Sequence, residues 1–264
     1  MSFQPVVPLS GYTGWRFLQQ TLTSQQTAFT QSAPVVRAAD YFRENITQIT
    51  NAEDLVNDRR LLEVALGAFG LDEDIDNKFF IQKMLEDGTT DDEALANRLS
   101  DTRYAEFSET FGFGDFDTPL STISVIADKI VSKFETQSFE SAVGDQNNDL
   151  RLALNFASSL EDVISGSTTK DAQWFSLMGN APLREVVQTA LGLPSEIASV
   201  DIDQQLKVFQ SRAESIFGSD SLSDLTDADS QEKMIRLFLI RSEAAAFSGA
   251  SGSSIALTLL QSGN

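Results

Sequence analysis

Hydrophobic residues recur at spacings of three and four along most of the chain, a pattern typical of amphipathic helices. The first stripe, Trp15, Leu18, Leu22 and Phe29, predicts a helix that ends near Gln31. Similar stripes follow to about residue 247, and no stretch alternates with a period of two between hairpin turns. The pattern therefore predicts an all-α protein of about a dozen helices, folded as a compact multi-helix bundle without a sheet.

Three segments resemble one another: NDRRLLEVALGAFGL at 57–71, SDTRYAEFSETFGF at 100–113 and NAPLREVVQTALGL at 180–193. In each, a helix with one apolar face runs into a glycine followed by an apolar residue. Glycine adopts the left-handed conformation that ends a helix without a Cβ penalty, and the apolar residue packs back onto the last turn. We predict that Gly70, Gly112 and Gly192 are helix stops within internally repeated helical units.

The similarity extends to the residues before the second and third segments. Thr90 with Glu93 has the spacing of a capping box, and Thr168 with Asp171 is a looser variant. Both positions are predicted to begin short helices.

The predicted helices divide the chain into four parts. Residues 1–33 hold an N-terminal segment and the first amphipathic helix, and residues 34–117 form a first helical half with two of the similar segments. Residues 118–248 start with a long linking helix, capped by Thr118 and ending at Gly144, and contain the second half with the third segment. Residues 249–264 are predicted to be a flexible tail with a small apolar anchor.

Composition narrows the classes of function. The chain of 264 residues has a net charge of -20, which disfavours binding to nucleic acid phosphates or anionic lipid headgroups. It contains no cysteine and no histidine, so thiolate catalysis, cysteine-ligated zinc and Ser-His-Asp chemistry are impossible within it. We expect a protein that is not an enzyme, has no cofactor and does not insert into a membrane.

Two stretches superficially resemble ligand-binding loops. Carboxylates at Asp72, Asp74 and Asp76 have the spacing that begins an EF-hand loop, but Asn77 and Lys83 stand where calcium needs glycine and glutamate. The stretch GFGDFD at 112–117 has two glycines but no preceding strand, so a turn is predicted and no phosphate site. No metal site is expected.

Other polar groups leave two readings open. Arg59, Arg60 and Arg103 could hold an anion, although pairing with local carboxylates is the preferred reading. Glu106 and Glu109 could supply an acid–base pair, but nothing distinguishes them from the many other carboxylates of the chain.

The order of several short motifs resembles the bacterial domain-of-unknown-function family 1217. The resemblance lies in the entry YFRENI, the helix ending in FGL, the step ANRL and the RY helix ending in FGF, and it covers residues 41–115 well. It implies a protein of motile bacteria, encoded among flagellar genes, with no established activity and no catalytic residues to assign.

Together these observations favour a non-enzymatic helical interaction protein, an accessory or assembly factor connected with the bacterial flagellum. Its expected partner is another protein, its expected location is the cytoplasm, and its oligomeric state is left open. One alternative is a structural component exported by the flagellar secretion apparatus. A carboxylate-based enzyme with a cleft between the two halves is a further alternative, and a module that binds a metal or small ligand is another.

Overall fold

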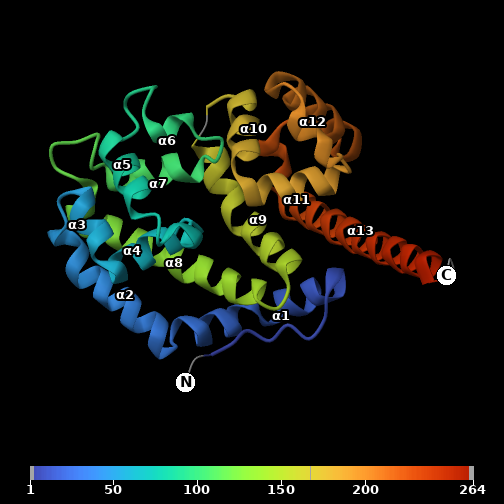
Figure 1. Cartoon of the computed structure of the whole chain (residues 1–264), viewed down its shortest axis with the longest axis horizontal. Coiled ribbons are helices and arrows are strands. Elements are labelled where there is room, and N and C mark those ends of the chain that lie inside the picture. The colour runs from blue at the N-terminus through green and yellow to red at the C-terminus, as the bar shows by residue number, and fades with distance from the viewer. Residues whose placement is uncertain (1–2, 167, 262–264) are drawn as a thin grey trace. The chain divides into compact units, whose positions relative to one another are not determined.

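A computed structural model describes the backbone of residues 3–166 and 168–261, and the side chains as far as residue 247. Within this described part the chain forms thirteen α-helices and five short 3-10 helices, and no strand. Figure 1 shows these helices joined by short loops. The predicted all-α class is confirmed.

The helices group into two compact units, each with its own core. Unit 1 comprises residues 1–6 and 20–146, and unit 2 comprises residues 7–19 and 147–264. The boundary predicted at 117 is therefore wrong, because the long helix that follows it packs on helices of the first unit. The predicted separate N-terminal part is also wrong, since its helix is divided between the two units after residue 19.

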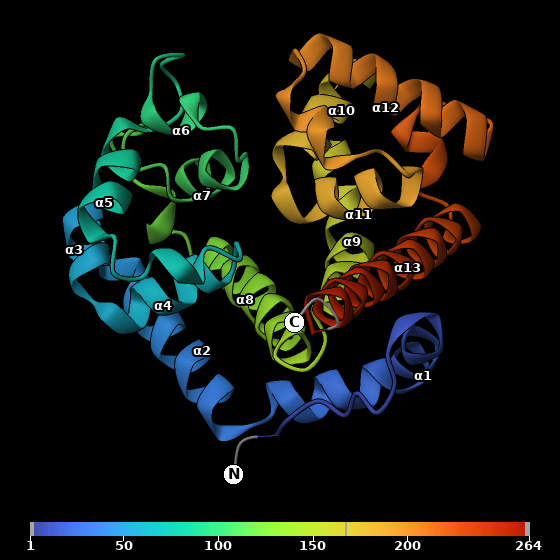
Figure 2. The same cartoon turned by 45° about the vertical axis from the view of Figure 1, so that its right-hand side comes forward.

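Unit 1 is arranged around the short helix α4, whose apolar side chains from Leu61 to Leu66 are fully buried. Helices α2, α3 and α8 pack against α4, and α5 packs on α3 and α7 (Figure 2). The helices are α2 (Ala33–Asn45), α3 (Ala52–Asn57), α4 (Arg59–Gly67), α5 (Lys78–Asp87), α6 (Leu95–Arg98), α7 (Arg103–Phe111) and α8 (Ser124–Gly144), with 3-10 helices η1 (Ile46–Gln48), η2 (Asp72–Asp74) and η3 (Leu120–Thr122).

Unit 2 is arranged around α11, which contacts all the other long helices of the unit. Its apolar face, from Leu183 to Leu191, is buried, and Trp174 of α10 packs edge-on against Phe209 of α12. The helices are α9 (Asn148–Ser165), α10 (Lys170–Gly179), α11 (Ala181–Leu191), α12 (Ile202–Phe217) and α13 (Ala228–Gln261), with 3-10 helices η4 (Ser195–Ser199) and η5 (Leu222–Leu225). The first helix, α1 (Gly11–Thr30), completes the set.

One local geometry occurs in both units. In the order α3, α4, η2, α5 and again in the order α10, α11, η4, α12, a short helix is followed by a central helix, a 3-10 turn and an amphipathic helix. Asp58 and Asn180 each end one helix and cap the next, with backbone angles of φ -91, ψ 97 and φ -89, ψ 106. Their side chains accept hydrogen bonds from the first free N–H groups of α4 and α11, as N-caps do.

The three predicted helix stops all have positive φ, at 64° for Gly70, 65° for Gly112 and 67° for Gly192. After Gly70, the N–H of Leu71 donates to the carbonyl of Leu66 at 3.0 Å, and Leu193 makes the same bond after Gly192. These are Schellman turns, in which the residue beyond the glycine closes the last turn. Gly112 makes the simpler left-handed cap, with one bond to Ser108.

The long helix α8 begins later than predicted. Thr118 does not cap it, because Leu120–Thr122 form a 3-10 turn and Ile123 has an extended backbone, so that α8 starts at Ser124. The Ser121 hydroxyl donates to the carbonyl of Ile49 at 2.8 Å and ties this turn to the end of η1. Residues 120–122, predicted to form the first turn of the helix, are therefore held in a 3-10 turn by a hydrogen bond to a distant part of the chain.

The two predicted capping boxes are also wrong in detail. The Thr90 hydroxyl donates to Asp115 at 2.8 Å, and the next helix, α6, begins only at Leu95. The N-cap of α10 is Thr169, one residue after the predicted Thr168, and its side chain accepts from the N–H of Ala172.

The predicted flexible tail is not a separate element, because the backbone of α13 continues as helix from Ala228 to Gln261. Glycine and serine lower helix propensity without forbidding the conformation, and no proline interrupts this stretch. The predicted apolar anchor at residues 255–260 lies beyond the described side chains.

Within unit 2, a single carboxylate joins the start of α1 to α13. Glu232 accepts hydrogen bonds from the Tyr12 hydroxyl at 2.7 Å, the Trp15 indole at 3.1 Å and the Gln19 amide at 3.2 Å. Arg16 adds an ion pair at 3.5 Å. Burial alone would raise the pKa of Glu232, but these bonds outweigh it and hold the pKa below the ordinary value of 4.5.

Gly70→Val should lower the free energy of unfolding by about 2 kcal/mol, because a β-branched residue is strained at positive φ. A Cβ at Gly70 would lie 3.3 Å from Arg103 Nη1, so little of the cost comes from a clash. Gly166→Ala is the control, since Gly166 has φ -69 and its Cβ would lie no closer than 3.6 Å to Asp162 O. Urea unfolding measures both, and equal stability of Gly70→Val and wild type would contradict the left-handed stop.

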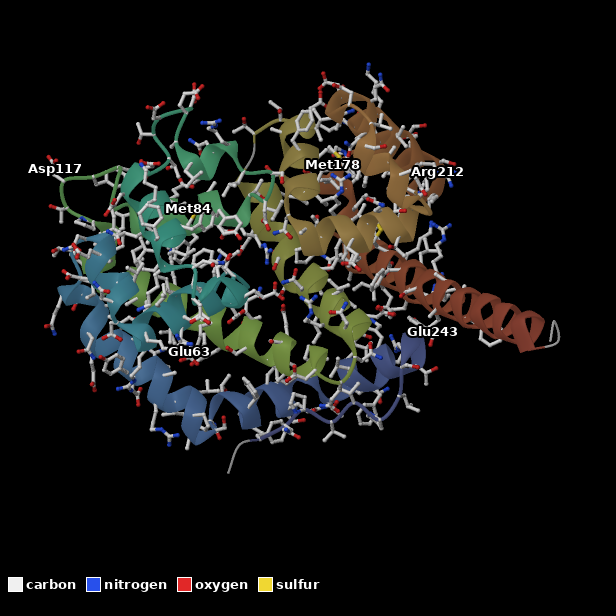
Figure 3. The ribbon with its side chains drawn as sticks, in the orientation of Figure 1. Glu63, Met84, Asp117, Met178, Arg212 and Glu243 are labelled. Atoms are coloured by element: carbon white, nitrogen blue, oxygen red, sulfur yellow. The ribbon has the colours of Figure 1, made fainter. Side chains whose placement is uncertain are left out.

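Glu232→Gln should lower the free energy of unfolding at pH 7 by about 1–2 kcal/mol, since hydrogen bonds to a charged acceptor are lost. The depressed pKa of Glu232 means that this stabilisation is complete above the ordinary glutamate pKa and is lost as pH falls through the folded-state pKa. The difference between variant and wild type should therefore shrink as the pH falls below the ordinary glutamate pKa. The exposed Glu63 of α4 (Figure 3) provides a control in Glu63→Gln, and a pH-independent difference would contradict the prediction.

Candidate interaction surface

The acidic stretch at residues 72–76 is bound by protein groups rather than arranged around a cation. Asp74 accepts a hydrogen bond from the Tyr104 hydroxyl at 2.5 Å, and Asp76 pairs with Arg59 at 2.9 Å. Among the described residues, no group of three His, Cys, Asp or Glu side chains could hold a metal ion. The carboxylates of this stretch thus stabilise η2 and its contacts with α4 and α7.

One of the two candidate acid–base carboxylates has a structural partner. Glu106 forms an ion pair with Lys133 of α8, and this contact joins α7 to the long helix. Glu109 is exposed. On the same helix, burial first and then the hydrogen bond to Asp74 raise the pKa of Tyr104 to about 12, so that its phenol stays neutral at physiological pH.

The three arginines do not converge on one anion. Arg60 lies over the ring of Tyr41, with 3.5 Å between its Cζ atom and the ring centroid. Arg103 donates to both oxygens of Asp101 at 2.7–3.1 Å and to the carbonyl of Gly70 at 2.6 Å. Arg59 and Arg103 pair with local carboxylates, the reading preferred from the sequence, whereas Arg60 stacks on an aromatic ring instead.

The glycine-containing loop at 112–117 is held in place by hydrogen bonds to residues 89 and 90. Asp115 accepts hydrogen bonds from the backbone N–H and the hydroxyl of both Thr89 and Thr90, at 2.7–3.0 Å. Burial would raise the pKa of Asp115, but these four bonds outweigh it and lower the pKa. The loop is a structural turn, held by the bonds of its carboxylate to Thr89 and Thr90.

Helix α13 packs on α11 and α9 along its first part and carries exposed apolar side chains further along. As far as Leu239 it is anchored in the core, where Met234, Ile235, Phe238 and Leu239 are at most 2% exposed. Two further contacts follow, as Arg241 donates to the carbonyl of Ala190 at 2.5 Å and Ser242 donates to Asp149 at 2.6 Å. They fix the middle of α13 against the end of α11 and the start of α9.

Beyond these contacts the side chains described on α13, at residues 243–247, are exposed. Glu243, labelled in Figure 3, lies near the first residue of α1, where its carboxylate accepts a bond from Ser10 at 3.4 Å. Figure 1 shows α13 continuing past α11 towards the C-terminus. Ile240 is 50% exposed and Phe247 is 79% exposed. Residues 240, 244 and 247 share one face of a helix, so we define this apolar face as the α13 surface.

The α13 surface continues into a stretch without charge. Residues 244–264 contain no Asp, Glu, Lys or Arg, although the whole chain has 58 such residues from 19 basic and 39 acidic ones. No helix in the described part of the chain is long and apolar enough to cross a membrane. An exposed apolar helix face such as that of Ile240 and Phe247 is suited to binding in an apolar groove of another protein.

The sequence contained a signal for this surface that the helix prediction did not use. Phe247 completes the spacing Ile240, Ala244, Phe247, but the same residues could equally have faced the core. Only the packing shows that the core ends at Leu239. The loss of charge after Glu243 was the better indication of a change in environment.

Comparison with known proteins gives two matches and one negative result. The chain matches the model of a family described as protein of unknown function (DUF1217) over residues 68–231. It is similar to the crystal structure of the protein AGR_C_984 from Agrobacterium tumefaciens, with a TM-score of 0.71, 28% identity, and coverage of 91% of this chain and 98% of that one. No curated protein matches.

The family match extends through much of unit 2, whereas the sequence resemblance was recognised at 41–115 and reached the second half only through the internal similarity. Helices α9 to α12 are recognisable from the spacing of apolar residues and from their caps more than from distinctive short motifs. The short motifs therefore identified the family correctly, but they did not show how far along the chain the match extends.

Proposed function

The chain belongs to the DUF1217 family of proteins of unknown function, and on that premise we propose that it is a non-enzymatic helical interaction protein. It acts as an accessory or assembly factor of the bacterial flagellum, the setting that the family resemblance implies. The observation that carries the proposal is the α13 surface, with Ile240 and Phe247 exposed on the part of the helix around and beyond the contacts of Arg241 and Ser242.

The chemistry of this surface indicates the kind of partner. An exposed helix with an apolar face binds by laying that face in an apolar groove, and one or two aromatic residues then contribute most of the affinity. Phe247 is the only aromatic side chain that α13 exposes within its described part. The partner is therefore a protein with a groove that accepts Phe247.

The proposal predicts that Phe247→Asp impairs function without unfolding the protein. Since a buried interface phenylalanine contributes about 2 kcal/mol or more, affinity for the partner should fall at least about tenfold. The measurement is the swimming-ring diameter of a strain with the substitution in its chromosomal gene, together with recovery of the co-purified partner. The deletion strain should have the same motility defect.

Phe79→Asp is the matched control, because Phe79 of α5 is 82% exposed but lies in unit 1. That variant should swim and retain the partner like wild type. Normal swimming of the deletion strain would refute the flagellar role. Normal swimming and partner recovery with Phe247→Asp alone would refute the α13 surface.

Fractionation of a secretion-competent strain tests where the protein acts. We place it in the cytoplasm with its partner, and it should stay in the cell fraction when flagellin is found in the medium. Recovery from the medium would instead support a structural component exported by the flagellar secretion apparatus.

A further inference from the structure

The segment before α1 lies along the protein in an extended conformation. Residues 3–6, called the strap below, belong to unit 1 and form no helix or strand. Figures 1 and 2 both show this segment running beside α1. Its side chains alternate, as Phe3 is half-buried, Gln4 exposed, Pro5 buried and Val6 53% exposed. Alternation of this kind is what an extended strand shows when one face contacts a protein surface.

A side-chain amide binds the strap as a neighbouring β-strand would. Gln25 Oε1 accepts from the N–H of Val6 at 2.6 Å, and Gln25 Nε2 donates to the carbonyl of Val6 at 3.2 Å. The Gln25 amide has the same donor and acceptor as a peptide group, so it can satisfy both backbone groups of one residue. Thr21 holds it in place by accepting from Nε2 at 2.8 Å.

The position of Gln25 is unusual for its residue type. It lies on the apolar stripe of α1 between Leu22 and Phe29, and it is only 6% exposed. A buried amide in such a place is costly unless its polar atoms are bonded, and the strap supplies two of the three bonds. A side chain on the apolar stripe of α1 thus binds the backbone of the strap.

A second amide binds the preceding residue. Gln146, in the turn after α8, donates from Nε2 to the carbonyl of Pro5 at 2.6 Å. Proline has no N–H, so burying Pro5 leaves no donor unsatisfied. The site therefore selects an extended segment with proline at one position and a free N–H at the next. Residues 1–10 carry no charge, so no ion pair contributes to this recognition.

We propose that Gln25 and Gln146 form a binding site for extended, uncharged, proline-containing segments of protein, and that the strap is its exchangeable resident. The backbone of the strap is held by hydrogen bonds to these two side chains, at Val6 by Gln25 and at Pro5 by Gln146. The same contacts are available to an identical segment of a second chain. Gln25 and Gln146 would therefore make the same hydrogen bonds whether the bound segment belongs to their own chain or to a second one.

The first experiment measures exchange in the full-length chain. Gln4 is exposed and the chain has no cysteine, so Gln4→Cys gives a single position for a fluorescent dye. A peptide of residues 1–10 at millimolar concentration should lower the anisotropy of the dye by displacing the strap, since a tethered segment has an effective concentration of that order. Gln25→Ala should lower it without peptide.

A peptide with Val6→Pro is the control, because it lacks the N–H that Gln25 binds. It should leave the anisotropy unchanged. No effect of either peptide would show that the strap is a fixed part of the fold and would overturn the proposal. An equal effect of both peptides would show that Gln25 does not recognise the backbone and would also overturn it.

The second experiment offers the site a labelled peptide. Pro5→Asp places a charge at a buried position and should release the strap, after which the full-length variant should bind dye-labelled residues 1–10 saturably. Adding Gln25→Ala to this variant should weaken binding at least tenfold. Absence of saturable binding to a Pro5→Asp protein that keeps its helical circular dichroism would refute the site; if that variant does not fold, the anisotropy experiment decides.

Discussion

The carbonyl groups at the ends of the two central helices impose the constraint on which each core depends. A helix leaves its last carbonyls without partners, and both α4 and α11 have buried apolar faces that run up to such an end. Each ends in a Schellman turn, and each turn receives an arginine from a later helix. Arg103 donates to Gly70 in unit 1, and Arg241 donates to Ala190 in unit 2. The positive guanidinium also interacts favourably with the negative end of the helix dipole. One side chain therefore both binds a free carbonyl and stabilises the dipole.

Much of the fold could be predicted because its determinants are local. The all-α class follows from apolar spacing, and glycine at positive φ followed by an apolar residue located the ends of α4, α7 and α11. The errors lie where a distant group intervenes. The bond from Ser121 to Ile49 accompanies the late start of α8, and Asp115 accepts from the Thr90 hydroxyl that was predicted to cap a helix. No window of sequence contains both partners of such bonds.

The same distinction applies to the candidate sites. The failure of residues 72–83 as a calcium loop could be derived from the sequence, because two required positions are wrong. The roles of Gln25 and Phe247 could not, since a polar residue on an apolar stripe and an aromatic residue on a helix each have several explanations. Burial of Gln25 and exposure of Phe247 decide between them. Gln25 is polar but buried, and Phe247 is apolar but exposed, which is the reverse of what is usual for these residue types.

The division of α1 between the units has a consequence for the order of synthesis. Residues 7–19 belong to unit 2, yet their partner Glu232 is translated more than two hundred positions after them. Residues 20–146 of unit 1 are contiguous and complete long before that, so this unit can acquire its core while the ribosome is still producing α9 to α13. The Trp15 indole N–H can reach its acceptor only after Glu232 of α13 has been made. Closure of unit 2 is thus a late step in synthesis, whereas the core of unit 1 can form early.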